Sequence, residues 1–134
     1  MFLALLSDEN KEKFIELCSL AADADGMVVE DEKNMIYAYC REMNIKEKFP
    51  ENNHRLEEIL ASIKKDSTEQ EQKIIVFESL GLLSADDEYT AEEEAFMQKI
   101  LEAFEISKES FNQMMSLFTI YKSVYKELWK TVIF

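Results

Sequence analysis

The segment AADADGMVVEDE, residues 21–32, holds the side chains best spaced for chemistry. A calcium-binding EF-hand loop has twelve residues of the form D-x-[DN]-x-[DN]-G and closes on a glutamate that binds the ion with both oxygens. On this pattern Asp23 and Asp25 take the second and third ligand positions and Glu32 the closing one. Ala21 stands at the first position, where the loop needs an aspartate, so a complete EF-hand is not predicted.

A looser cation site is the alternative, in which Asp23, Asp25 and Glu32 converge on one ion. Oxygen-only ligands select Ca²⁺ or Mg²⁺ over softer metals, and no other cofactor is predicted. Carboxylates packed together without a cation raise each other's pKa by repulsion, which favours a bound ion. The competing interpretation needs no metal, because Asp25-Gly26 is an ordinary turn signal and Glu32 suits the positive end of a helix dipole.

The acidic pattern recurs 61 residues further along the chain. Residues 81–106 align with residues 20–45 without a gap, and Asp86 and Glu93 then stand at the third-ligand and closing positions. These two carboxylates are therefore a second set of candidate metal ligands. Thr90 and Glu93 also form a T-x-x-E capping box, which explains Glu93 as a helix cap without a metal.

Apolar residues recur at helical spacing along almost the whole chain, and only 2 glycines and 1 proline are present. Strand-rich folds need many tight turns, so this composition indicates a helical protein. We expect one all-α domain over residues 1–134, a bundle of six or seven helices with repeats at about 14–45 and 75–106. Ser67, with Gln70 three residues on, is the expected N-cap of the fourth helix. The expected helices cover about residues 8–22, 29–43, 52–65, 68–84, 91–104 and 108–132.

The bulk composition narrows the function classes. The net charge of −13 opposes binding to nucleic acid or anionic lipid, while it suits cations, basic partners or solubility alone. Cys18 and Cys40 form no C-x-x-C pair, so buried thiols in a reducing compartment are expected. The N-terminal segment does not have the form of a signal peptide, and no apolar run is long enough to span a bilayer. These features predict a cytoplasmic protein.

The C-terminal segment LFTIYKSVYKELWKTVIF, residues 117–134, is aromatic and apolar with interspersed lysines. Core packing of one long helix is the simplest expectation. The alternative is a groove or homodimer contact through Tyr121, Tyr125 and Trp129, because aromatic residues are enriched at interface cores. A basic ridge accompanies these residues at Lys122, Lys126 and Lys130.

No sequence signature for catalysis is present. His54 is the only histidine, which argues against di-iron and zinc centres, and a solvated position is expected for it. Nucleophile elbows, phosphate-binding glycine loops and Cys–His pairs are absent from the sequence. An enzyme with an acid-lined pocket is the least favoured interpretation.

The stretch AADADGMVVEDEKNMIYAYCREMNI, residues 21–45, resembles the signature of TerB-like proteins, the tellurite resistance B family. The shared pattern is a helix end of small residues, an acidic D-x-D-G turn and a helix that opens with glutamate. The duplicated helix–turn–helix and the chain length also fit, over about residues 10–106.

The resemblance implies an all-helical fold with acidic residues near the helix starts. It also implies a non-enzymatic role in bacterial metal or chemical stress, with membrane-protein partners. The carried-over positions are Asp23, Asp25, Gly26 and Glu32, followed by Asp86 and Glu93 in the second copy. Ser84 and Asp87 depart from the pattern.

The predicted function is a binding or scaffolding module of a bacterial stress response, with weak Ca²⁺ or Mg²⁺ binding. The partner is expected to be a protein, which includes a membrane-associated one, or a second copy of the chain. Nucleic acid and direct membrane insertion are not expected. The alternative is an interaction module without metal, which acts through its acidic face or its C-terminal aromatic helix.

Overall fold

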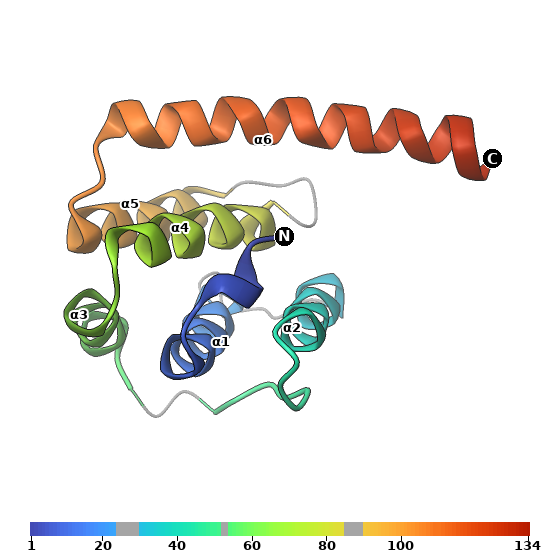
Figure 1. Cartoon of the computed structure of the whole chain (residues 1–134). Coiled ribbons are helices and arrows are strands. Elements are labelled where there is room, and N and C mark those ends of the chain that lie inside the picture. Colours follow the sequence, from blue (N-terminus) through green and yellow to red (C-terminus); the bar gives the residue numbers. More distant parts are fainter. Residues whose placement is uncertain (24–29, 52–53, 85–89) are drawn as a thin grey trace.

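The computed structural model describes residues 1–23, 30–51, 54–84 and 90–134, which form α-helices and no strand (Figure 1). The all-α fold predicted from the sequence is therefore confirmed. A short 3₁₀ turn, η1, precedes the first α-helix, and a π-helical turn, η2, follows the last. The elements are η1 (Leu3–Leu5), α1 (Asp8–Ala22), α2 (Glu30–Glu42), α3 (Leu56–Asp66), α4 (Glu69–Leu83), α5 (Ala91–Phe104), α6 (Lys108–Leu128) and η2 (Trp129–Ile133).

Two helices organise the packing. α1 lies against α2, α3 and α4, while α4 also contacts α5, α6 and η1. Figure 1 shows α6 lying above α4 and α5 and projecting past the other helices. The core between the helices contains fully buried side chains such as Phe14, Ile36, Ile63, Ile75 and Ile100. Burial of such apolar surface is the main stabilising force of the bundle.

Hydroxyl side chains start most of the helices. The Oγ of Ser7 accepts the amide of Asn10 at the start of α1, and Ser107 caps α6 in the same way. These caps satisfy amides that have no partner within the helix. The expected cap at Ser67 was wrong by one residue, because Thr68 caps α4 in a box with Glu71. Ser67 instead donates its hydroxyl hydrogen to the Ile63 carbonyl.

The two helix pairs α1–α2 and α4–α5 keep the same offset along the chain. α4 begins and ends 61 residues after α1, and their N-caps Ser7 and Thr68 have the same separation. α2 and α5 are both followed by a residue in the left-handed conformation, Asn44 with φ 57° and Glu105 with φ 55°. Such a residue lets the following amide bond back onto the last turn of a helix. The offset seen in the acidic pattern therefore extends to the helix bounds and the helix ends.

The Glu71 carboxylate joins the start of α1 to the start of α4. It accepts hydrogen bonds from the Ser7 amide (2.9 Å), the Asn10 side-chain amide (3.0 Å) and the Thr68 amide (3.1 Å). Burial alone would raise the pKa of this carboxyl, but the bonds from Ser7, Asn10 and Thr68 outweigh it and hold the pKa below its usual 4.5. Glu71 is thus a charged cap shared by two helices.

We expect Glu71→Gln to lower the free energy of unfolding by about 2 kcal/mol at pH 7, the scale of hydrogen bonds to a charged group. Because the folded pKa lies below 4.5, this stabilisation is complete above pH 4.5 and is lost as the pH falls through the folded value. Urea unfolding at several pH values measures the difference, which should shrink in acid. Glu69→Gln, at an exposed position of the same helical turn, is the matched control and should change little. Equal effects of the two substitutions would contradict the shared cap.

Candidate functional site

The first acidic segment, residues 21–32, is described only at its two ends. Asp23 follows α1 as its C-cap, with an exposed side chain, and its amide donates to the Ser19 carbonyl. Glu32 lies in the first turn of α2 with only 5% of its surface exposed. Asp25 and Gly26 lie outside the described residues. The convergence of Asp23, Asp25 and Glu32 on a cation therefore stays a prediction.

The second acidic set is described at Glu93 alone, since Asp86 lies outside the described residues. The carboxylate of Glu93 accepts the Thr90 amide at 3.0 Å, and the Thr90 hydroxyl oxygen accepts the Glu93 amide at 3.1 Å. This is the capping box expected from the T-x-x-E spacing. Within the described ranges, His, Cys, Asp and Glu side chains form no group of three that could hold a metal ion.

His54 lies before α3 and is exposed, as expected, but it has a partner. Its Nδ1 lies 2.6 Å from Oε1 of Glu16 on α1. The hydrogen bond with Glu16 and the negative charge of that carboxylate raise the pKa of His54 above its usual 6.5. The contact connects the segment before α3 to α1.

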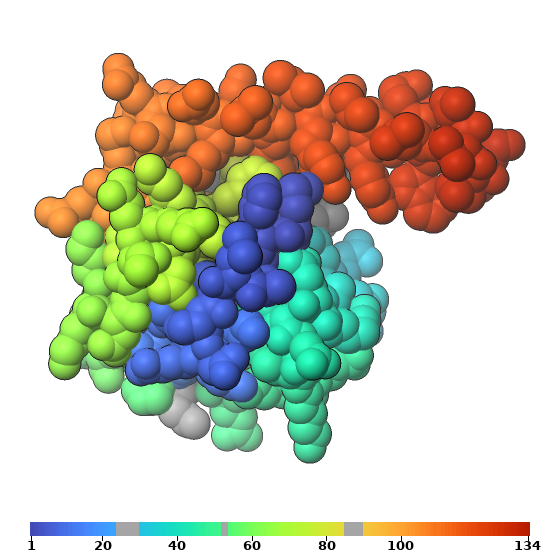
Figure 2. Space-filling model, viewed as in Figure 1, coloured from blue at the N-terminus to red at the C-terminus, as the bar shows by residue number. Residues whose placement is uncertain are grey.

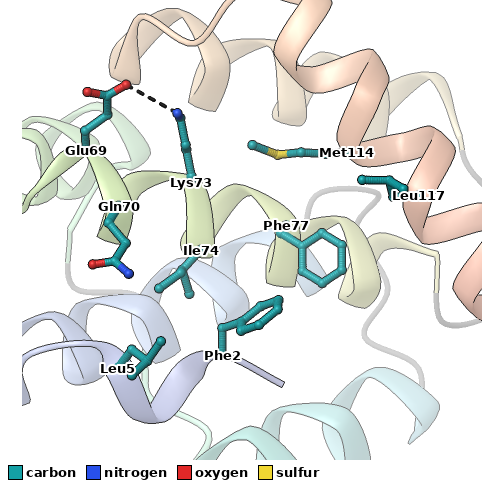
Figure 3. Close-up of a pocket in the computed structure, with 9 residues that line it drawn as sticks. All are labelled: Phe2, Leu5, Glu69, Gln70, Lys73, Ile74, Phe77, Met114 and Leu117. Carbon is teal, nitrogen blue, oxygen red and sulfur yellow. Dashed lines mark ion pairs between the residues drawn. The ribbon is translucent and has the colours of Figure 1, made fainter.

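An apolar groove lies between η1, α4 and α6 (Figure 3). It has a volume of about 670 Å³, and six of its nine lining side chains are apolar. Figure 3 shows side chains of η1 and α4 on one wall and side chains of α6 on the other. The apolar lining residues are Phe2, Leu5, Ile74, Phe77, Met114 and Leu117.

Phe77 lines the groove and contacts two other aromatic rings. Its ring lies 5.9 Å from the ring of Phe2 and 5.7 Å from that of Phe118, the latter edge-on. Such tilted aromatic contacts hold the rings in place beyond the effect of burial alone. Two carboxylates fix the first wall, because the Phe2 amide donates to Glu78 at 3.1 Å and the Leu3 amide donates to Glu42 at 3.0 Å. The groove is therefore built on anchored backbone.

The ionisable side chains that line the groove lie at one of its ends. Glu69 and Lys73 form an i, i+4 ion pair of 3.4 Å on α4, drawn as a dashed line in Figure 3. Glu69 is 82% exposed to solvent and Lys73 is 47% exposed. An apolar groove with polar groups at its edge suits an apolar ligand whose polar parts remain in water.

The expectation that the C-terminal helix packs on the core is correct only for its first half. Phe111 is buried, and Met114, Met115 and Phe118 pack against the core. Beyond Phe118 every residue is exposed. Figure 2 shows the red end of α6 reaching past the other helices, with open space beneath it.

Of the three residues predicted to contact a partner, two lie in this exposed half of α6 and the third, Trp129, begins η2 directly after it. Tyr121, Tyr125 and Trp129 are 42%, 49% and 44% exposed, so their side chains are available for binding. The groove itself was missed by the sequence interpretation. The run FLALL at residues 2–6 could have indicated it, because a single turn cannot bury so many apolar side chains.

The fold and the site define an all-α module with an apolar groove under its last helix and an acidic sequence segment between α1 and α2 and between α4 and α5. No family model matches this sequence, and no curated protein matches it significantly. A tellurite resistance protein from Nostoc punctiforme has the same fold, with a TM-score of 0.72 over 96% of this chain and 84% of that chain. Sequence identity is 20%, so this likeness establishes the fold. The resemblance to tellurite resistance proteins is thereby confirmed at the level of the fold. Among the described helices, none has both the length and the apolar character to cross a membrane.

We expect the pKa of His54 to lie above 6.5 in the folded protein and to fall towards 6.5 in Glu16→Gln, because the substitution removes the charge that favours the protonated ring. The stabilisation from this pair is present below pH 6.5 and is lost as the pH rises through the folded pKa. NMR titration of the ring protons measures this value, since His54 is the only histidine. Glu58→Gln is the control, because Glu58 acts on His54 more weakly than Glu16 does. A folded pKa at or below 6.5 in the wild type would contradict the contact.

Proposed function

We propose that this chain is a non-catalytic, cytoplasmic protein-binding module of a bacterial stress response of the tellurite or metal type. The observation that carries the proposal is the apolar groove between η1, α4 and α6. Its occupant is an amphipathic helix of a protein partner, whose apolar face lies along Phe77 and Leu117. Helix-in-groove recognition uses apolar anchors at i, i+3 or i+4 and i+7, which an apolar groove can receive.

The exposure of the lining supports a binding role. Leu5 and Leu117, on opposite walls, are 62% and 58% exposed. Burial of apolar surface contributes about 25 cal/mol per Å² of favourable free energy. A partner that covers these exposed side chains would gain this free energy on binding. The anchored backbone of η1 adds to this, because a preformed wall lowers the entropy cost of association.

The chemistry of the groove favours binding over catalysis. A catalytic pocket usually combines a nucleophile or base with a group that shifts its pKa. Here the ionisable lining residues are Glu69 and Lys73, which pair with each other in solvent. The stress assignment is supported by the fold shared with the Nostoc punctiforme protein and by the TerB-like acidic turn. A membrane-associated protein is the expected partner on the same resemblance.

We expect a strain that lacks this gene to become more sensitive to tellurite and the wild-type gene to restore growth. Leu117→Asp should fail to restore it, because a carboxylate in the groove cannot be buried against an apolar helix. Ser116→Asp is the matched control, since Ser116 is the exposed neighbour of Leu117 and does not line the groove. Growth at graded tellurite concentrations, with immunoblots for protein level, measures the effect. Full rescue by Leu117→Asp would remove the groove from the function.

The proposal includes weak binding of Ca²⁺ or Mg²⁺ by Asp23, Asp25 and Glu32. The spacing of these carboxylates supports it, together with the position of Glu32 in the first turn of α2. We expect a calcium dissociation constant on the order of 10⁻⁴–10⁻³ M, as in weak carboxylate sites. Isothermal calorimetry should show heat for the wild type and none for Asp25→Ala. Glu57→Ala, at an exposed carboxylate on α3, is the control. Identical heats for the wild type and Asp25→Ala would contradict the site.

A further inference from the structure

The projecting half of α6, together with the η2 turn that continues it, carries an apolar face that no part of the described chain covers. Six of its side chains share one face at helical spacing and are 42–69% exposed. This set, called the distal stripe, consists of Tyr121, Val124, Tyr125, Leu128, Trp129 and Val132. It continues the face through which Met114 and Phe118 pack against the core. The ring contact of Tyr121 with Tyr125, at 5.9 Å, lies within the stripe itself.

We propose that the distal stripe is a homodimer interface, occupied by the same stripe of a second copy in antiparallel orientation. This goes beyond the proposed function, because it concerns the projecting half of α6 rather than the groove. The exposed fractions leave on the order of several hundred Å² of the six residues open to solvent, the same order as the ~800 Å² that each partner buries in a standard interface. An exposed apolar patch on a monomer is usually only a few hundred Å².

The charge distribution of the chain favours a second copy over an anionic membrane as the partner. Residues 108–134 carry four lysines and two glutamates, a net +2, which leaves −15 on residues 1–107. An anionic bilayer would attract the basic helix but repel the acidic body that accompanies it. A second copy offers an acidic body to each basic helix, and the repulsion between the two acidic bodies depends on how the copies are oriented.

The charge distribution also favours an antiparallel over a parallel arrangement of the two copies. In a parallel pair, two bodies of −15 would lie side by side at the same end of the helices. An antiparallel pair places the bodies at opposite ends and brings each helix tip, with Lys126 and Lys130, towards the acidic body of the other copy. The open space beneath the end of α6 in Figure 2 provides room for the second helix. The two copies then form an isologous interface related by a twofold axis.

The oligomeric state tests the proposal. Sedimentation velocity should show a dimer of the 15.7 kDa chain with a micromolar dissociation constant. Leu128→Asp should weaken it by at least about 100-fold, because each copy would bury an unpaired charge. Ser123→Asp, on the opposite face of α6, is the matched control and should leave the dimer intact. Circular dichroism checks that all variants remain helical.

Cysteine cross-linking tests the orientation. In the antiparallel pair Tyr125→Cys, near the middle of the stripe, should form an intermolecular disulfide, whereas Val132→Cys, at its end, should not. The native Cys18 and Cys40 are buried, so the wild-type protein should form no intermolecular disulfide and gives the background level of cross-linking. A wild-type monomer at all concentrations, a dimer that survives Leu128→Asp, or efficient cross-linking at Val132→Cys would each overturn the proposal. Monomers that bind vesicles of phosphatidylcholine and phosphatidylglycerol through the stripe would also overturn it.

Discussion

The fold depends on one buried carboxylate that serves two helices at once. Glu71 completes the capping box of α4 and also accepts the amide of Ser7, which caps α1. The Asn10 side chain adds a third donor from α1. These bonds fix the relative position of the two helices that organise the bundle. Since η1 leads directly into α1, they also set where η1 lies against α4, and with it the first wall of the groove.

The second wall depends on how closely α6 can approach α4. Gly81 of α4 lies at this contact: a Cβ atom there would lie 3.8 Å from the Phe118 ring, an ordinary van der Waals distance, and 3.2 Å from the Tyr39 hydroxyl of α2, which is tight. The Tyr39 hydroxyl donates to the Glu78 carbonyl in the same turn, so α2 is held at this contact as well. α6 is therefore attached along its first half, where Phe111 and Phe118 pack, and it leaves the body beyond Phe118. The groove and the distal stripe both follow from this arrangement, in which α6 contacts the other helices only along its first half.

The sequence predicted the parts of this structure that local physics decides. Helical periodicity placed the helices, and the spacing of Thr90 and Glu93 placed a capping box. Ser67 and Thr68 are both good caps with Gln70 and Glu71 three residues on, so local rules could not choose between them. The contact of Glu71 with Ser7, 64 residues away, favours Thr68. Likewise, the apolar residues of the distal stripe would have the same sequence spacing whether they were buried in the core or exposed to water. Only the position of the helix in the tertiary structure decides between burial and exposure.

The carboxylates show why charge alone is a weak guide to a site in this protein. The described residues include four buried glutamates, Glu32, Glu71, Glu78 and Glu93. Glu71 and Glu93 cap helices, and Glu78 accepts the Phe2 amide, so acidic side chains hold backbone in place throughout the fold. A carboxylate at a helix start already has a partner in the exposed amides there, and a cation must compete with those amides for the same oxygens. Exposed apolar side chains have no such internal partner. The apolar groove and the distal stripe therefore leave apolar surface in contact with water, and burial of that surface by a partner would supply binding energy.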